Sequence, residues 1–417
     1  MMLVLGVLLL TVVSLFSVFL EELLPIEVDT VVGFMLLTGF IAKFAFGKPA
    51  WKRSVLDIPV LILIAAGLIT LTAMTFRGSD YLRETAAQLI SLIMVMGMSL
   101  VIVQILRDFR SIGLTLLVFT LITAAIALLG ILALLLNIQT IYIGGAEITV
   151  ARRWGGVGVR IGGAYEQPNI FATPLVLALP LSVAFALTGA SRVRQLFWVG
   201  AAGICAVALL LSQSRSGTLG AFLGILMMSV ILARGIKPSK LICYVIVIGL
   251  FAYGALTMTG MLNPALERLS PSYQAYQLET GRPEQNRLLI WQRALPLAFQ
   301  NPFGYGAETA YLIGASFGIE RKGVHNVFLS SLTGLGWLGF VGILLLVIKP
   351  IRRLWRFVYR VSNTEWKVIG AGLLGGLVGF WIHNLFHSMI HWMAVWIYFA
   401  CVAATIQLTY IGEGGTS

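Results

Sequence analysis

Four short polar segments interrupt a largely apolar sequence and hold the residues whose types suit chemistry. The last of them, at 323–329, contains His325 where a polar stretch meets an apolar run. Nearby positive charge lowers the pKa of an imidazole, so a histidine beside several arginines stays neutral at pH 7 and can accept a proton. His325 is therefore a candidate general base. A helix cap or an interfacial histidine would explain the same residue without a reaction.

Arginine is the second recurring residue type in these segments. Arg215 lies in the turn 212–217, and Arg282 and Arg287 lie in a longer polar stretch. A guanidinium group is planar and matches two phosphate oxygens with two parallel hydrogen bonds. A cation near the membrane boundary is costly without a partner, which a bound phosphate would provide. The arginines therefore indicate an anion-binding surface. Solvation, pairing with loop carboxylates and contact with lipid phosphate are the alternatives.

The longer polar stretch is predicted to contain two helices, at about 271–281 and 283–293, each opened by a proline. Arg287 and Trp291 are four residues apart on the second helix and share a face. Apolar residues occupy another side, so this helix should lie along the membrane surface and hold its arginine at headgroup depth. The turn 301–306 then reverses the chain.

The segment 160–169 would place neutral hydrogen-bonding groups at the outer mouth of an apolar helix. It begins with Arg160, its glycines allow a sharp turn, and its proline suits the first turn of a helix. Hydroxyl-rich ligands such as sugars favour neutral donors and acceptors, although ordinary helix capping explains the segment as well. The polar residues expected at the mouth are Tyr165, Glu166, Gln167 and Asn169.

Three further histidines, His383, His387 and His391, are spaced four residues apart. On a continuous helix they would form one stripe, which is a pattern that can bind a metal ion. No carboxylate or cysteine accompanies them, and the segment crosses an expected turn. We therefore predict no metal site here, and the sequence assigns no other role to the three residues.

The elements that must position these residues are membrane helices. Of the 417 residues, 59% are hydrophobic and 11% are charged, whereas a soluble domain carries about a quarter charged residues. The apolar runs of about 18 to 25 residues have the length that crosses a bilayer, and the backbone of such a run must be helical to satisfy its hydrogen bonds. The sequence predicts an all-α integral membrane protein with about 12 transmembrane helices, surrounded by membrane lipids and without a nucleic-acid partner.

The expected spans fall into three parts. Residues 1–136 hold the first five spans, residues 137–348 form a core with polar loops at 137–167 and 261–325, and residues 349–417 hold the last two spans. The predicted spans are 2–20, 28–46, 57–76, 85–106, 111–136, 168–188, 195–212, 217–234, 240–260, 326–348, 367–385 and 389–410.

The distribution of basic residues predicts the orientation of these spans. With the N-terminus inside, the inner loops contain most of the Lys and Arg residues and every Lys except Lys322. Short loops rich in Lys and Arg stay in the cytoplasm. Both termini are therefore predicted to be cytoplasmic, and the four polar segments are predicted to share the opposite, outer face.

Taken together and in order, the polar segments resemble the O-antigen ligase family over roughly residues 155–345. Each motif alone is weak, but the ordered combination on one membrane face is fairly specific. The matching motifs are Gly-x-x-x-x-Pro-Asn at 163–169, Ser-Arg-Ser-Gly at 214–217, Arg-x-x-x-Trp at 287–291, Asn-Pro-x-Gly-x-Gly at 301–306 and His-Asn-x-x-Leu at 325–329.

This resemblance implies a glycosyltransferase that works at the periplasmic face of the inner membrane of a Gram-negative bacterium. The implied donor is a glycan on undecaprenyl diphosphate. For a ligase, the implied acceptor is lipid A–core, so that the reaction completes lipopolysaccharide. The family uses no metal, nucleotide sugar or other cofactor, and the expected mechanism is an inverting displacement.

The resemblance also implies roles for individual residues. Arg215 and Arg287 would bind the diphosphate and neutralise its charge as it leaves, and His325 would take the proton of the acceptor hydroxyl. The other residues implied to bind substrate are Arg282, Arg160, Asn169, Tyr165, Gln167, Asn326, Tyr305 and Trp291.

Three other activities stay open at this point. A polymerase of the same superfamily would use the same donor chemistry and add repeat units to each other. A transporter or flippase for lipid-linked sugars would need charged residues in the middle of its spans, and the predicted spans contain almost none. A peptidoglycan polymerase would need a metal and a loop carboxylate such as Glu267 or Glu308.

Overall fold

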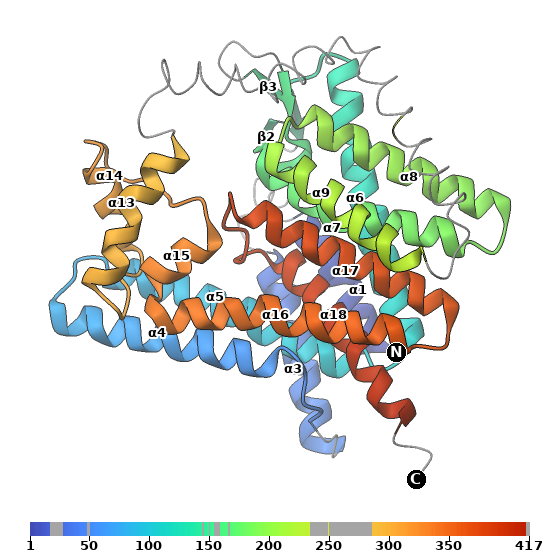
Figure 1. The fold of residues 1–417 in the computed structure, drawn as a ribbon, viewed down its shortest axis with the longest axis horizontal. Coiled ribbons are helices and arrows are strands. Elements are labelled where there is room, and N and C mark those ends of the chain that lie inside the picture. Colours follow the sequence, from blue (N-terminus) through green and yellow to red (C-terminus); the bar gives the residue numbers. More distant parts are fainter. Residues whose placement is uncertain are drawn as a thin grey trace.

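The structure, a computed structural model, is almost entirely helical in the part of the chain that it describes. The described residues are 1–16, 28–47, 51–143, 146–149, 151–153, 159–165, 167–233, 249 and 286–413. Figure 1 shows long helices that lie alongside one another, with the shorter helices α13, α14 and α15 gathered at one end of the bundle.

Eight of the described helices lie before residues 234–285, a stretch that is outside the described part of the chain apart from Gly249, and six lie after it. The first group is α1 (Met2–Leu15), α3 (Val28–Gly47), α4 (Asp57–Arg77), α5 (Leu82–Ile105), α6 (Phe109–Leu135), α7 (Pro168–Thr188), α8 (Arg192–Leu211) and α9 (Arg215–Leu232). The second group is α13 (Arg287–Gln300), α14 (Glu308–Ala315), α15 (Val327–Gly334), α16 (Gly336–Arg360), α17 (Thr364–Asn384) and α18 (Met393–Glu413).

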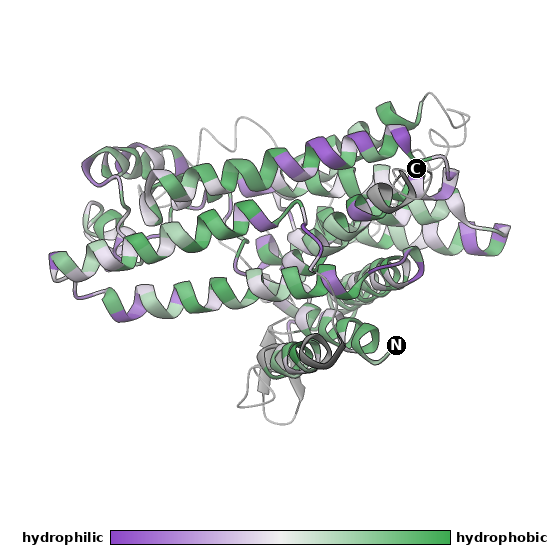
Figure 2. Cartoon of the chain, turned by 90° about the horizontal axis from the view of Figure 1, so that it is seen from below, coloured by the Kyte–Doolittle hydropathy of each residue, from purple (hydrophilic) through white to green (hydrophobic). Residues whose placement is uncertain are grey.

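The helices have the length and composition of a membrane protein. Among the described residues, seven helices are long and apolar enough to cross a bilayer, namely α4, α5, α6, α7, α8, α9 and α17. Hydrophobic residues cover most of the long helices, as Figure 2 shows. The predicted helical membrane fold is thereby confirmed. The expected number of about 12 spans stays a prediction, and the span at 240–260 lies outside the described residues apart from Gly249.

The span expected at 326–348 has a different form. The chain makes the short helix α15, breaks at Leu335, and then continues as α16 to Arg360. Gly336 has a φ of +70°, and a Cβ on it would lie 2.2 Å from the Pro302 carbonyl oxygen. The break therefore exists because the turn at 301–306 packs directly against the backbone of this segment, which hydropathy alone does not reveal.

The expected outer loop at 137–167 contains secondary structure that the sequence did not predict. Strands β1 (Thr140–Ile143) and β2 (Ala146–Thr149) pair antiparallel, and so do β3 (Ala151–Arg153) and β4 (Val159–Ile161). A one-turn 3-10 helix, η1 (Gly163–Tyr165), then leads into α7. These two short hairpins are an exception to the all-α fold class.

Hydrogen bonds between distant segments define the first end of the bundle, which we call the Lys52 end. The Gln104 side chain exchanges two hydrogen bonds with the backbone of Lys52, and the Gln407 side chain donates to the Arg53 carbonyl at 3.1 Å. The Phe109 ring packs on Trp366 at 4.4 Å between centroids. The segments around Lys52, Phe109 and Trp366, all in loops predicted to be cytoplasmic, therefore meet at one end.

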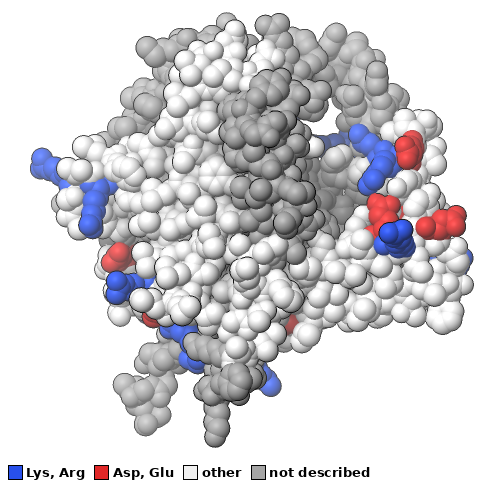
Figure 3. All heavy atoms as spheres, turned by 180° about the vertical axis from the view of Figure 1, so that it is seen from behind, with Lys and Arg blue, Asp and Glu red and all other residues white. Residues whose placement is uncertain are grey.

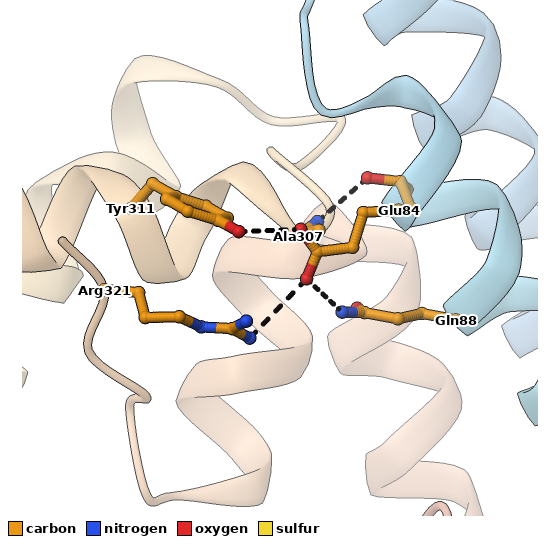
Figure 4. A network of polar contacts seen from close by, with 6 residues as sticks. Glu84, Gln88, Ala307, Tyr311 and Arg321 are labelled. Atoms are coloured by element: carbon orange, nitrogen blue, oxygen red, sulfur yellow. Dashed lines mark hydrogen bonds and ion pairs between the residues drawn. The ribbon is translucent and has the colours of Figure 1, made fainter.

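The opposite end, which we call the His325 end, gathers the loops that were predicted to share the outer face. Glu84 at the start of α5 accepts a hydrogen bond from the Tyr311 hydroxyl and pairs with Arg321 at 3.5 Å. The Ala307 amide donates to the Thr85 hydroxyl (Figure 4). The segment from 301 to 326 is therefore anchored on α5. On the face in Figure 3, charged residues gather toward two opposite sides with uncharged residues between them.

Two buried helices carry polar residues toward the His325 end. Helices α7 and α17 are the most buried of the seven long apolar helices. Gly220 and Gly224 of α9 lie so close to α17 that a Cβ on either would come within 2.4 Å of an α17 carbonyl oxygen. Such close backbone packing through small residues is typical of membrane helix pairs. Asn169 on α7 and His383 on α17 therefore stand on rigid supports.

Candidate functional site

Arg287 lies at the centre of a polar cluster at the His325 end. It is the first residue of α13, whose N-terminus is capped by the Asn286 side chain accepting from the Leu288 amide at 3.0 Å. The half-buried Arg287 places its Nη2 at 3.4 Å from Nε2 of His387 and its guanidinium 5.7 Å from the Phe386 ring centroid. Helix α13 thus directs a cation onto the connection between α17 and α18.

His325 faces the same cluster from another segment. Its backbone has a φ of +52°, and the next residue, Asn326, caps α15 by accepting from the Leu329 amide at 3.0 Å. The His325 and His387 ring centroids are 6.5 Å apart. The left-handed backbone conformation is uncommon for a residue other than glycine, and it turns the His325 side chain out of the α15 axis.

The pKa of His325 is lowered from its ordinary value to about 4. The largest cause is desolvation by the surrounding protein, followed by the positive charges of Lys322 and Arg287. The side chain nevertheless keeps an exposed surface, so it lies in a recess that solvent can reach. His325 is therefore neutral at pH 7 and free of a proton on one ring nitrogen, as a proton acceptor must be.

The structure adds two histidines to which the sequence assigned no role. The buried His383 has its Nδ1 at 3.0 Å from the Ser216 hydroxyl and its Nε2 at 3.2 Å from the Asn169 carbonyl oxygen. Its ring packs against His387 at 4.7 Å between centroids. Burial, with the nearby His383 and Arg287, lowers the pKa of His387. Both residues thus link the arginine to the bundle core.

The turn that was expected within the histidine segment is present, so His383, His387 and His391 do not lie on one helix. Helix α17 ends at Asn384, whose side chain accepts from the Met389 amide at 2.8 Å and so holds the connection 385–392 in a compact turn. His387 consequently turns toward Arg287, while His391 lines a separate cavity. The sequence does contain a signal for His387. The span predicted at 367–385 ends two residues before it, at the same end of the bundle as the arginines.

Arg160 and Asn169 approach the cluster from the other side. The buried Arg160 of β4 donates from Nε to the Ser212 carbonyl at 2.9 Å, and its Nη2 lies 3.4 Å from the Asn169 side-chain oxygen. The Arg160 charge also contributes to lowering the pKa of His387. The structure therefore brings Arg160, Asn169, Arg287 and His325 to one region.

Arg215 has an exposed side chain at the first position of α9. The next residue, Ser216, is buried and contacts His383. Arg215 therefore lies at the edge of the cluster, next in sequence to the residue that contacts His383. Arg282 lies outside the described residues.

The remaining expected residues lie at three places. The Trp291 indole donates to the Val324 carbonyl at 3.1 Å and so ties α13 to the segment that bears His325. Tyr305 packs against the guanidinium of Arg77 at 4.9 Å and belongs to the α4 side of this end. Tyr165 is buried with its hydroxyl donating to the Leu15 carbonyl, and Gln167 is exposed just before α7.

A cavity of about 210 Å³ lies beside His325. Gly323 and Val324 form part of its wall, and the His325 ring is 3.7 Å from where a Cβ on Gly323 would stand. Its lining is mainly apolar, and none of its lining residues in the described chain is Asp, Glu, Lys or Arg. Neutral polar side chains complete the lining, namely Thr85, Gln88, Thr309, Ser330, Ser331, Ser388 and His391.

Residues 200–344 match a protein-family model described as O-antigen ligase. The match covers about a third of the chain and includes Arg215, Arg287 and His325, whereas Arg160 and the two cluster histidines lie outside it. A search of curated proteins found no match. The resemblance expected from the sequence motifs is thereby confirmed for this region.

Proposed function

From the O-antigen ligase region at 200–344, we propose that the protein is an O-antigen ligase. It would transfer a glycan from undecaprenyl diphosphate to lipid A–core at the periplasmic face of the inner membrane. The observation that carries this proposal is the convergence of Arg287, His325 and His387 at one end of a helical membrane bundle. Arg287 supplies positive charge for a diphosphate, and His325 supplies an unprotonated nitrogen beside it.

The proposed donor site is the arginine side of the cluster. Arg287 is half-buried and Arg160 is buried, so their charges act in a medium that screens them less than water does. Both interact best with an anion of high charge density, such as a diphosphate. Arg215 at the edge, and Arg282 in the preceding segment, would complete the set that stabilises the leaving group.

The proposed acceptor site is the cavity side of the cluster. The cavity lining beside His325 is neutral, which suits a sugar hydroxyl better than it suits a diphosphate. Gly323 and Val324, the two residues before His325, form part of this lining. An in-line displacement would require the acceptor hydroxyl and the diphosphate to lie on opposite faces of the anomeric carbon of the donor glycan.

The proposed step is a single inverting displacement. The acceptor oxygen forms a bond to the anomeric carbon of the donor glycan while the bond from that carbon to the diphosphate oxygen breaks. The electron pair leaves with undecaprenyl diphosphate, where the arginines stabilise the added negative charge. The proton of the acceptor hydroxyl passes to the neutral His325.

Binding of the donor would also adjust the base. Desolvation and, to a smaller extent, the charges of Lys322 and Arg287 lower the pKa of His325 in the free protein. A bound diphosphate is negative and offsets these two charges but not the desolvation, so the pKa of His325 would be higher with the donor bound than without it. The imidazole would become a stronger base at the moment at which the reaction needs one.

The nearest alternative is a polymerase of the same superfamily, because the family match supports the donor chemistry of both. The two activities leave different products when the gene is deleted in its host. Deleting a ligase leaves polymerised glycan on undecaprenyl diphosphate, which we expect. Accumulation of single repeat units would instead identify a polymerase.

A further inference from the structure

The two cluster histidines lie outside the matched family region and take no part in the displacement described above. His387 contacts Arg287, and His383 packs behind His387. Hydrogen-bonding rules fix the proton on each ring, because each ring has one partner that can only donate or only accept.

His387 must be neutral with its proton on Nδ1. The Arg287 guanidinium carries only donors, and its Nη2 lies 3.4 Å from Nε2 of His387. Nε2 therefore accepts and carries no hydrogen. A charged imidazole at this place would direct an N–H group at another cation.

His383 must have the opposite arrangement, with its proton on Nε2. The Asn169 backbone oxygen can only accept, and it lies 3.2 Å from Nε2 of His383. Nδ1 then accepts from the Ser216 hydroxyl at 3.0 Å. Both nitrogens are occupied and the side chain is 0% exposed, so the ring is fixed between α7, α9 and α17.

We propose that His387 is a positioning residue for Arg287, with the fixed His383 ring as its support. The guanidinium group is planar, so a hydrogen bond at Nη2 together with the Phe386 ring at 5.7 Å sets the plane of the whole group. The inference rests on the proposed binding of a diphosphate by Arg287. It adds that two neutral histidines orient the cation without lowering its charge.

The test compares two substitutions of similar size at one position. His387→Gln keeps a neutral acceptor, whereas His387→Leu removes it, and both remove the imidazole. Farnesyl diphosphate is titrated into the full-length protein in nanodiscs, and binding is followed by microscale thermophoresis. A hydrogen bond to a charged group predicts that His387→Leu weakens binding about 10-fold, while His387→Gln stays close to the unmodified protein.

A double-mutant cycle separates positioning from a general structural effect. In an Arg287→Ala background, His387→Leu is expected to cause no additional loss, because the residue acts only through that arginine. Arg293→Ala, an exposed arginine on the same helix, is the charge control and should leave binding nearly unchanged. Thermal unfolding of each variant identifies any that lose the fold.

The outcomes distinguish this inference from the proposed function. If Arg287→Ala weakens binding but His387→Leu does not, His387 has no positioning role and the proposed donor site stands. Equal loss for the Leu and Gln variants, or additive loss in the cycle, also contradicts the inference. If Arg287→Ala itself binds farnesyl diphosphate normally, the donor site is wrong and the inference fails with it.

Discussion

At the scale of single residues, the site depends on side chains whose charge is set by their neighbours. Arg287 is held against a neutral histidine, and His325 is kept neutral by desolvation and by nearby cations. The sequence predicted both residues, because arginine and a lone histidine are conspicuous in apolar surroundings. It predicted the turn near Asn384 but not the contact of His387 with Arg287, because that contact joins segments 100 residues apart.

The pH dependence of transfer follows from His325. The protonated imidazole cannot accept a proton, so kcat/KM is expected to stay flat near neutrality and to fall only as the pH drops through about 4. Initial rates measured between pH 4 and pH 8 at low donor concentration check this. An acid limb near pH 6.5, the ordinary pKa of histidine, would contradict the assigned environment.

Lys322→Gln tests the same pKa by removing one of the positive charges that lower it. Removing this positive charge raises the pKa of His325, so the acid limb of kcat/KM should move to higher pH while the rate at pH 8 changes little. Arg293→Gln serves as the control because Arg293 is not among the groups that shift this pKa. An unchanged acid limb in Lys322→Gln would show that His325 is not the group that titrates.

At the scale of elements, the Asn-Pro-Phe-Gly-Tyr-Gly turn at 301–306 forms a clamp, by which we mean that its backbone is hydrogen-bonded to the C-terminal end of α15. The Tyr305 amide donates to the Thr333 carbonyl at 2.8 Å, and the Gly306 amide donates to the Gly334 carbonyl at 2.9 Å. The sequence predicted a chain reversal at this turn but not its partner. The partner is the break between α15 and α16, and only packing between the two segments creates that break.

Substituting Gly304 in this turn should therefore lower the stability of the protein by more than the backbone strain of a positive φ alone would. Gly304 has a φ of +84°, and a Cβ on it would lie 2.4 Å from the Gly334 carbonyl oxygen. Gly318 has a φ of +70° with nothing within 4 Å. Gly318→Ala should cost about 1 kcal/mol from conformation, and Gly304→Ala roughly 3 kcal/mol or more because a contact must also open.

Thermal unfolding in detergent compares the two glycine variants. A clearly lower Tm for Gly304→Ala than for Gly318→Ala is the expected order. Equal Tm values would mean that the turn can move away from α15 without loss, and the clamp would then not be a structural requirement.

At the scale of the whole molecule, the chain has two loop-bearing ends separated by apolar helices. Hydropathy and the distribution of Lys and Arg correctly predicted that the segments around Lys52, Phe109 and Trp366 share an end, because both depend on composition along the chain. The site was less predictable, since Arg287 and His387 are 100 residues apart in the sequence. Local patterns carry no information about which distant segments meet.

The predicted orientation is testable with engineered cysteines. Gly318→Cys lies at the His325 end and Ser362→Cys at the Lys52 end. Cys205 and Cys401 are buried, and Cys243, which lies outside the described residues, is replaced by serine in both variants. A membrane-impermeant maleimide added to spheroplasts should label Gly318→Cys and leave Ser362→Cys unlabelled until the cells are lysed. The reverse pattern would place the cluster in the cytoplasm and exclude the proposed periplasmic reaction.

The most direct test of the account is the transfer rate of purified His325→Ala protein. The assay uses the full-length chain in nanodiscs with an undecaprenyl-diphosphate-linked glycan and lipid A–core, and Arg293→Ala as the control. Loss of the general base predicts a decrease in rate of about 100-fold or more, with farnesyl diphosphate binding retained. Transfer by His325→Ala at the rate of the unmodified protein would contradict the central claim.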